Sequence, residues 1–93
     1  MAVSYKAPVK DVIFAFDVLD SYNILQKIER FTDFSPEIAV PAIEECAKFA
    51  EEVLAPINSV GDTHGATFKD GKVIMPPGFH EAYDKFKKAG WAS

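Results

Sequence analysis

One long amphipathic segment constrains this chain more than any other feature of its sequence. Ser35 and Pro36 form a helix-start signal, because a hydroxyl can cap the first free N–H groups and proline has no N–H to satisfy. Apolar side chains then recur at helical spacing, at Ala39, Ala42, Ile43, Cys46, Ala50, Val53 and Leu54. The pattern predicts a helix over about 37–55 with one apolar face, and that face needs a partner surface.

Two prolines set the expected limits of this helix. Pro41 removes one backbone hydrogen bond and crowds the turn before it, so we expect the helix to begin there or to have a distorted first turn. Pro56 restricts the residue before it and is expected to end the helix. The polar, glycine-containing residues 58–65 are then predicted to form a loop.

Shorter elements are expected on the N-terminal side. Residues 1–9 are predicted to form an extended arm, followed by helices over about 10–20 and 21–30. Ser21 is the candidate N-cap of the second helix. The connector after it carries two rings that favour burial, those of Phe31 and Phe34.

On the C-terminal side, Asp70-Gly71 between two short β-prone runs predicts a hairpin over 67–75, since glycine readily takes a positive φ. A last helix is expected over about 79–89, with Gly90 as the residue that ends it. The fold class is therefore mainly α: a small helical domain with one short β-hairpin. Its expected parts are an arm with short helices over 1–35 and a helical domain over 36–93.

Composition excludes several classes of protein. Of 93 residues, ten are basic and fourteen acidic, a net charge of -4 that argues against binding a nucleic-acid backbone. No apolar run approaches the roughly 20 residues of a transmembrane segment, and the first residues lack the pattern of a secretory signal. A single cysteine excludes an internal disulfide and a Cys-rich metal site. We therefore expect a cytoplasmic protein.

The residues that could carry chemistry have simpler interpretations. Four glutamates, which could pair for acid–base work, belong to the charged faces of the long helix: Glu44, Glu45, Glu51 and Glu52. His64 in the predicted loop and His80 at a helix start have no ligand spacing with Cys46, which we expect to be a buried, inert thiol.

Two further features, a pair of glycines and a tryptophan, are candidate sites. Gly61 and Gly65 lack the ending of a phosphate loop and are expected to serve backbone turns. Trp91 either caps a small core or packs on a partner, and the sequence leaves both open. We therefore predict no catalytic, cofactor-binding or metal-binding residue in this chain.

An ordered series of short motifs is more informative than any single one. It consists of Tyr5-Lys-Ala-Pro8 with Asp11 and Phe14, Phe49-Ala-Glu-Glu-Val-Leu-Ala-Pro56, Asn58, Gly61-Asp62, Gly65, Asp70-Gly-Lys-Val73, Pro76-Pro-Gly-Phe79, Glu81-Ala-Tyr83 and Gly90-Trp91. The series resembles the N-terminal part of the flavin-dependent acyl-CoA dehydrogenase family. It is most similar to the branch with an extended N-terminal arm, which includes 3-methylmercaptopropionyl-CoA dehydrogenase-like enzymes.

The resemblance covers essentially the whole chain, with two departures. Val12-Ile13 stands where many relatives carry a basic residue, and Thr63-His64 replaces a more acidic pair. Both are surface-type changes.

The resemblance implies a helical N-terminal domain followed by a β domain and a four-helix domain, with FAD between the last two. In such enzymes a glutamate removes the α-proton of an acyl-CoA thioester while the flavin takes the β-hydride. An electron-transfer flavoprotein commonly reoxidises the flavin, and homo-oligomers are common. Those flavin and base regions have no counterpart here, so no functional residue is carried over.

The first hypothesis is therefore an N-terminal segment of an FAD-dependent acyl-CoA dehydrogenase of fatty acid metabolism. It would help to wall the acyl pocket and to pack subunits, it would not be catalytic alone, and it would hold no FAD by itself. One alternative is a freestanding small helical module that uses its aromatic face to hold a partner helix or an acyl group. Another is one subunit of a split dehydrogenase whose catalytic domains lie on a second chain.

Overall fold

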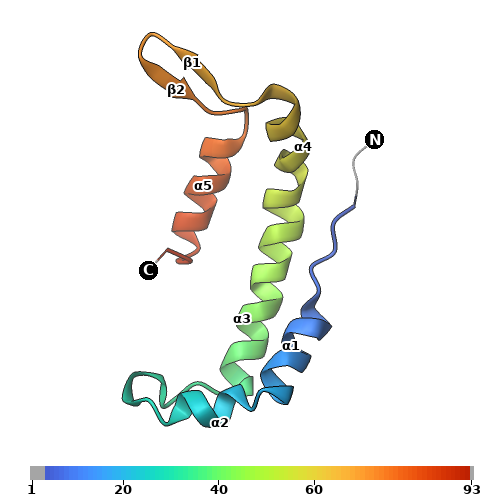
Figure 1. The fold of residues 1–93 in the computed structure, drawn as a ribbon, viewed down its shortest axis with the longest axis vertical. Coiled ribbons are helices and arrows are strands. Elements are labelled where there is room, and N and C mark those ends of the chain that lie inside the picture. Colours follow the sequence, from blue (N-terminus) through green and yellow to red (C-terminus); the bar gives the residue numbers. More distant parts are fainter. Residues whose placement is uncertain (1–3, 93) are drawn as a thin grey trace. The chain divides into compact units, whose positions relative to one another are not determined.

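The computed structural model (Figure 1) describes residues 4–92. These residues divide into two compact units. One unit comprises residues 6–49, and the other comprises residues 50–92 with residues 4–5. The predicted fold class is confirmed, because the described chain is mainly helical with one two-stranded antiparallel hairpin. Within residues 4–92 no helix combines the length and apolar character needed to cross a bilayer.

Unit 6–49 contains three α-helices and one short 3-10 turn. These elements are α1 (Val9–Val18), α2 (Ser21–Gln26), the 3-10 turn η1 (Glu29–Phe31) and α3 (Pro36–Phe49). Helix α1 contacts both α2 and α3. On α3 the buried residues are Ala39 and Ala47, about two turns apart on one stripe.

The junction of α1 and α2 differs from the sequence-based expectation. Asp20, rather than Ser21, stands at the N-cap position of α2, and it adopts a left-handed conformation with φ 54°. Its carboxylate accepts a 2.7 Å hydrogen bond from the Asn23 amide. Aspartate tolerates this conformation because its short side chain can bond locally, so the chain turns sharply here without a glycine.

Helix α3 begins where the Ser35-Pro36 signal places it. The Ser35 carbonyl accepts hydrogen bonds from the N–H groups of Ile38 and Ala39, at 3.1 and 2.8 Å. The alternative start at Pro41 is wrong, because α3 runs through this residue. A proline so close to the helix start deletes one interior backbone bond, a loss that the rest of the helix outweighs.

In unit 50–92 the chain starts as a π-helical segment, η2 (Ala50–Leu54), followed by α4 (Ala55–His64). Two expectations are therefore wrong: Pro56 does not end a helix, and residues 58–64 are not a loop. Pro56 lies at the first turn of α4, where a missing N–H costs little. The polar residues beyond it are exposed, so they remain hydrated on a helix as well as they would in a loop.

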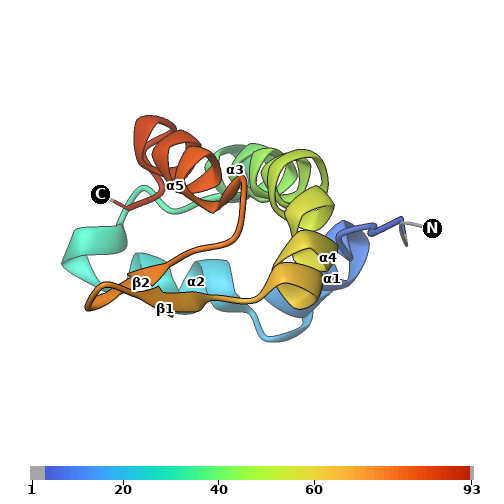
Figure 2. The same ribbon diagram turned by 90° about the horizontal axis from the view of Figure 1, so that it is seen from above.

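The predicted hairpin is confirmed as β1 (Thr67–Lys69) and β2 (Lys72–Ile74), which connect α4 to α5 (Figure 2). The two turn residues, Asp70 and Gly71, have φ of 53° and 76°, the pattern of a type I′ turn. Both strands are exposed along their whole length.

The last helix, α5 (Phe79–Lys88), starts after Gly78 and stops at Gly90, both with positive φ. At its end the N–H of Gly90 bonds the Lys87 carbonyl and the N–H of Trp91 bonds the Phe86 carbonyl, at 3.0 and 3.3 Å. This pair of bonds is a Schellman motif and confirms Gly90 as the C′ residue.

Little of the apolar surface is buried. The chain exposes 7577 Å², more than the roughly 6,500 Å² expected for two separate compact proteins of half its mass. Among residues 4–92 the buried hydrophobic residues are three alanines, Ala39, Ala47 and Ala82. Most large apolar side chains are therefore accessible to another surface.

Candidate functional site

The side chains that most often do chemistry stay apart in this structure. Within residues 4–92 no group of three or more His, Cys, Asp or Glu side chains is close enough to hold a metal ion. Glu44 and Glu45 are exposed on α3, and adjacent helical residues diverge by about 100°. In η2, Glu51 is half-buried and Glu52 exposed.

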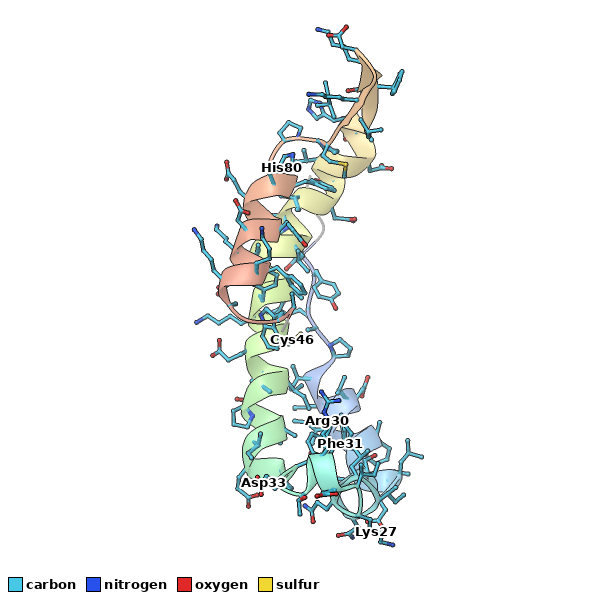
Figure 3. The ribbon with its side chains drawn as sticks, turned by 90° about the vertical axis from the view of Figure 1, so that its left-hand side faces the viewer. Lys27, Arg30, Phe31, Asp33, Cys46 and His80 are labelled. Atoms are coloured by element: carbon cyan, nitrogen blue, oxygen red, sulfur yellow. The ribbon has the colours of Figure 1, made fainter. Side chains whose placement is uncertain are left out.

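Cys46 corrects the sequence-based expectation. We predicted a buried thiol, but the side chain is exposed on α3 (Figure 3). The buried line of α3 passes through Ala39 and Ala47 and is narrower than the apolar stripe in the sequence, so Cys46 lies at its edge.

Both histidines are exposed, and one of them lies in a different element from the one predicted. His64 is the last residue of α4 rather than part of a loop, whereas His80 stands in the first turn of α5 as expected (Figure 3).

The clearest packing centre in unit 6–49 is a three-ring cluster. The rings of Phe16, Tyr22 and Phe34 lie with centroids 5.4 to 5.9 Å apart. The Gln26 side-chain amide donates a 2.6 Å hydrogen bond to the Phe34 carbonyl and fixes the connector to α2. The Tyr22 hydroxyl is buried and has no hydrogen-bond partner among the described residues.

The sequence predicted only part of this cluster. Phe34 is half-buried as its apolar character predicts, but Phe31 in the same connector is 44% exposed. Tyr22 was missed because it precedes the Ile24, Leu25 and Ile28 pattern, and its role depends on the sharp turn at Asp20.

The connection between α2 and α3 presents charges of both signs to solvent. Figure 3 shows Lys27, Arg30, Phe31 and Asp33 around it, and all four are exposed. No ion pair joins them within the described part of the chain. The turn therefore offers solvated charges rather than a built binding site.

An open depression of about 370 Å³ lies in unit 50–92, between the second half of α4 and the start of α5. Its lining residues are Asn58, Gly61, Asp62, Ala66, Met75, Pro76 and Phe79. A second, of about 360 Å³, is lined by five consecutive residues, 7–11.

Neither depression suits a flavin dinucleotide. The first has a carboxylate and no cationic side chain to meet the pyrophosphate, and the second is formed by one segment. These two depressions of the described chain therefore do not fit FAD.

Helices α4 and α5 approach each other closely at the first depression, which Gly61 and Phe79 both line. A Cβ on Gly61 would lie 2.6 Å from the Phe79 ring carbon Cζ, and one on Gly78 would lie 3.1 Å from an Ile57 methyl carbon. Gly65, in contrast, serves the backbone: it ends α4 with φ 65°. Gly61 was expected to mark a turn, but it is helical and its small size admits the ring.

The chain is similar to an individual enzyme rather than to a protein-family model. No protein-family model matches the chain. The chain is 35% identical over 91 residues to 3-methylmercaptopropionyl-CoA dehydrogenase from Ruegeria pomeroyi, and it matches the N-terminal part of that protein. The aligned region covers 98% of this chain and 16% of the relative, so the chain spans about one sixth of the relative's length.

Proposed function

We propose that this chain is the N-terminal segment of an FAD-dependent acyl-CoA dehydrogenase. The whole enzyme would catalyse α,β-dehydrogenation of an acyl-CoA thioester in fatty acid metabolism. The segment would help to wall the acyl pocket and to pack subunits, and it would not be catalytic by itself. The observation that carries the proposal is the similarity to a named acyl-CoA dehydrogenase along 98% of the chain.

The distribution of apolar residues supports a role inside a larger assembly. Helix α1 carries apolar side chains on both of its faces: Ile13 and Phe16 are half-buried, whereas Phe14 and Val18 are 67% and 62% exposed. Large apolar side chains left exposed on the outer face of a helix are typical of a surface that contacts another protein. The unit that carries α1 is therefore suited to contact another protein surface on its outer face.

The proposal assigns flavin and catalytic base to other parts of the longer enzyme. The open depressions of this chain do not suit FAD, and its glutamates are distributed along helix surfaces. What this chain would contribute is apolar contact area and a fixed helical frame. A homo-oligomeric enzyme that passes electrons to an electron-transfer flavoprotein, in the cytoplasm, completes the proposal.

The test is to tag this sequence at its native locus, purify the product and measure its intact mass and flavin absorbance. We expect a mass several-fold above 10.3 kDa and bound flavin whose absorbance bleaches when an acyl-CoA is added without oxygen. A 10.3 kDa product with flavin on a separate copurifying chain would instead identify a split dehydrogenase. A 10.3 kDa product without any flavin partner would refute the proposal in favour of a freestanding binding module.

A further inference from the structure

We infer that the β1–β2 hairpin is the element by which this segment docks onto the rest of the dehydrogenase. The partner takes the hairpin between two surfaces, an apolar one that meets Phe68 and Val73 on one face and an acidic one that meets Lys69 and Lys72 on the other. The inference rests on the proposed function, because it takes that larger enzyme as the partner.

The first support is the exposure of a paired apolar face. Phe68 and Val73 stand directly opposite each other in the ladder, so their side chains share one face of the hairpin. They are 75% and 65% exposed, and Phe68 has the highest exposed fraction among the large hydrophobic residues of the described chain. A two-stranded hairpin by itself is marginal in water, so a surface that covers this face would stabilise it.

The second support is electrostatic. Lys69 and Lys72 also stand directly opposite each other, next to the turn, and like charges in that position destabilise a ladder. Within residues 4–92 neither lysine forms an ion pair. Carboxylates on a partner would convert this repulsion into two favourable contacts.

The hairpin is also prepared for docking by its backbone. The type I′ geometry at Asp70 and Gly71 fixes the register, so the apolar pair and the lysine pair are presented on opposite faces at the same time. A pre-formed element loses less conformational entropy on docking than a flexible loop does.

The length of the relative indicates which polypeptide covers the hairpin. The relative extends well beyond the region that this chain matches, since that region is 16% of it. The remaining five-sixths is a polypeptide large enough to provide an apolar surface on one side of the hairpin and carboxylates on the other.

The test uses a chimeric holoenzyme in which this chain replaces the matched N-terminal region of the Ruegeria protein. Phe68→Cys is introduced in a Cys46→Ser background, and maleimide labelling at that position is followed by peptide mass spectrometry. The 93-residue chain alone is labelled in parallel, and Thr63→Cys on α4, also exposed, is the matched control.

We expect labelling of Phe68→Cys to be at least tenfold slower in the chimera than in the isolated chain, with the control changed by less than threefold. Equal rates in a flavin-loaded chimera would overturn the inference and leave the proposed function standing. Slow labelling already in the isolated chain, or an equal slowing at Thr63→Cys, would also overturn it. A chimera that retains no flavin would count against the proposed function, and the inference would fall with it.

A second variant tests the charge. Lys69→Glu/Lys72→Glu in the chimera should lower the melting temperature by several degrees, whereas the matched reversal of two exposed lysines on α5, Lys85→Glu/Lys88→Glu, should have a smaller effect. Equal effects of the two reversals would overturn the acidic character of the partner surface.

Discussion

The two units of this chain hold their secondary-structure elements together by different kinds of contact. Unit 6–49 joins its helices through three large rings, Phe16, Tyr22 and Phe34, and a side-chain hydrogen bond from Gln26. Unit 50–92 joins its elements by close approach, with Gly61 against the Phe79 ring. The packing of unit 6–49 depends on large side chains, whereas the packing of unit 50–92 depends on a glycine that has no side chain.

This difference predicts different sensitivities to mutation. A ring cluster is destabilised when atoms are removed, because the transfer free energy and the contacts are lost together. A glycine contact is destabilised when atoms are added, because a Cβ overlaps a neighbour. Substitutions in opposite directions should therefore identify which unit is affected.

The largest expected effect is that of Phe34→Ala. Removing this half-buried ring eliminates contacts with both other members of the cluster and should destabilise unit 6–49 by about 2–3 kcal/mol. Urea unfolding followed by NMR resonances of residues 6–49 measures it. The control is Phe14→Ala, a 67% exposed ring on α1, with an expected change of about 0.5 kcal/mol or less. Equal effects would mean that the cluster does not stabilise the unit.

Gly61→Ala tests the other unit in the opposite direction. Overlap of the new Cβ with the Phe79 ring should exceed the roughly 1 kcal/mol gain in helix propensity, for a net loss of about 1 kcal/mol. Unfolding is followed by the fluorescence of Trp91, which lies in this unit. In a Phe79→Leu background the loss should disappear or change sign. An unchanged loss there would show that the ring is not its cause.

Tyr22→Phe sharpens the description of the ring cluster. It keeps the ring and removes a buried hydroxyl that has no partner among residues 4–92, so it should stabilise unit 6–49 by up to about 1 kcal/mol. Tyr83→Phe, at a 57% exposed side chain on α5, is the control and should be neutral. A clear loss of stability with Tyr22→Phe would reveal that the hydroxyl has a partner in solution.

The smallest effect belongs to a surface ion pair between Lys87 and Asp84. Its atoms are 3.6 Å apart and both side chains are more than half exposed. Asp84→Asn should lower stability by about 0.5 kcal/mol or less, and 1 M salt should abolish the difference. Asp62→Asn on α4 provides the unpaired comparison. A larger effect that persists in salt would contradict a screened surface pair.

Local signals in the sequence were sufficient for several elements. Ser35-Pro36 located the start of α3, Asp70-Gly71 located the hairpin, and Gly90 located the end of α5. Each depends on the backbone preferences of one or two residues, which neighbours elsewhere in the chain scarcely alter.

The errors occurred where local signals were ambiguous. Pro56 can end one helix or begin another, and it begins α4, so the following polar segment is helical rather than a loop. The apolar stripe around Cys46 was wider than the face that is buried. No candidate site could have been read from these residues, because convergence of side chains depends on contacts between elements.

The sequence by itself therefore determined the helical class, the hairpin and the similarity to a dehydrogenase, because these depend on residue order and local conformation. The tertiary structure decided which apolar groups are covered. It grouped Phe16, Tyr22 and Phe34, set Gly61 beneath the Phe79 ring, and left Phe68 and Val73 exposed. Burial is a property of neighbours, and neighbours distant in the chain are specified only when the helices and the hairpin have packed.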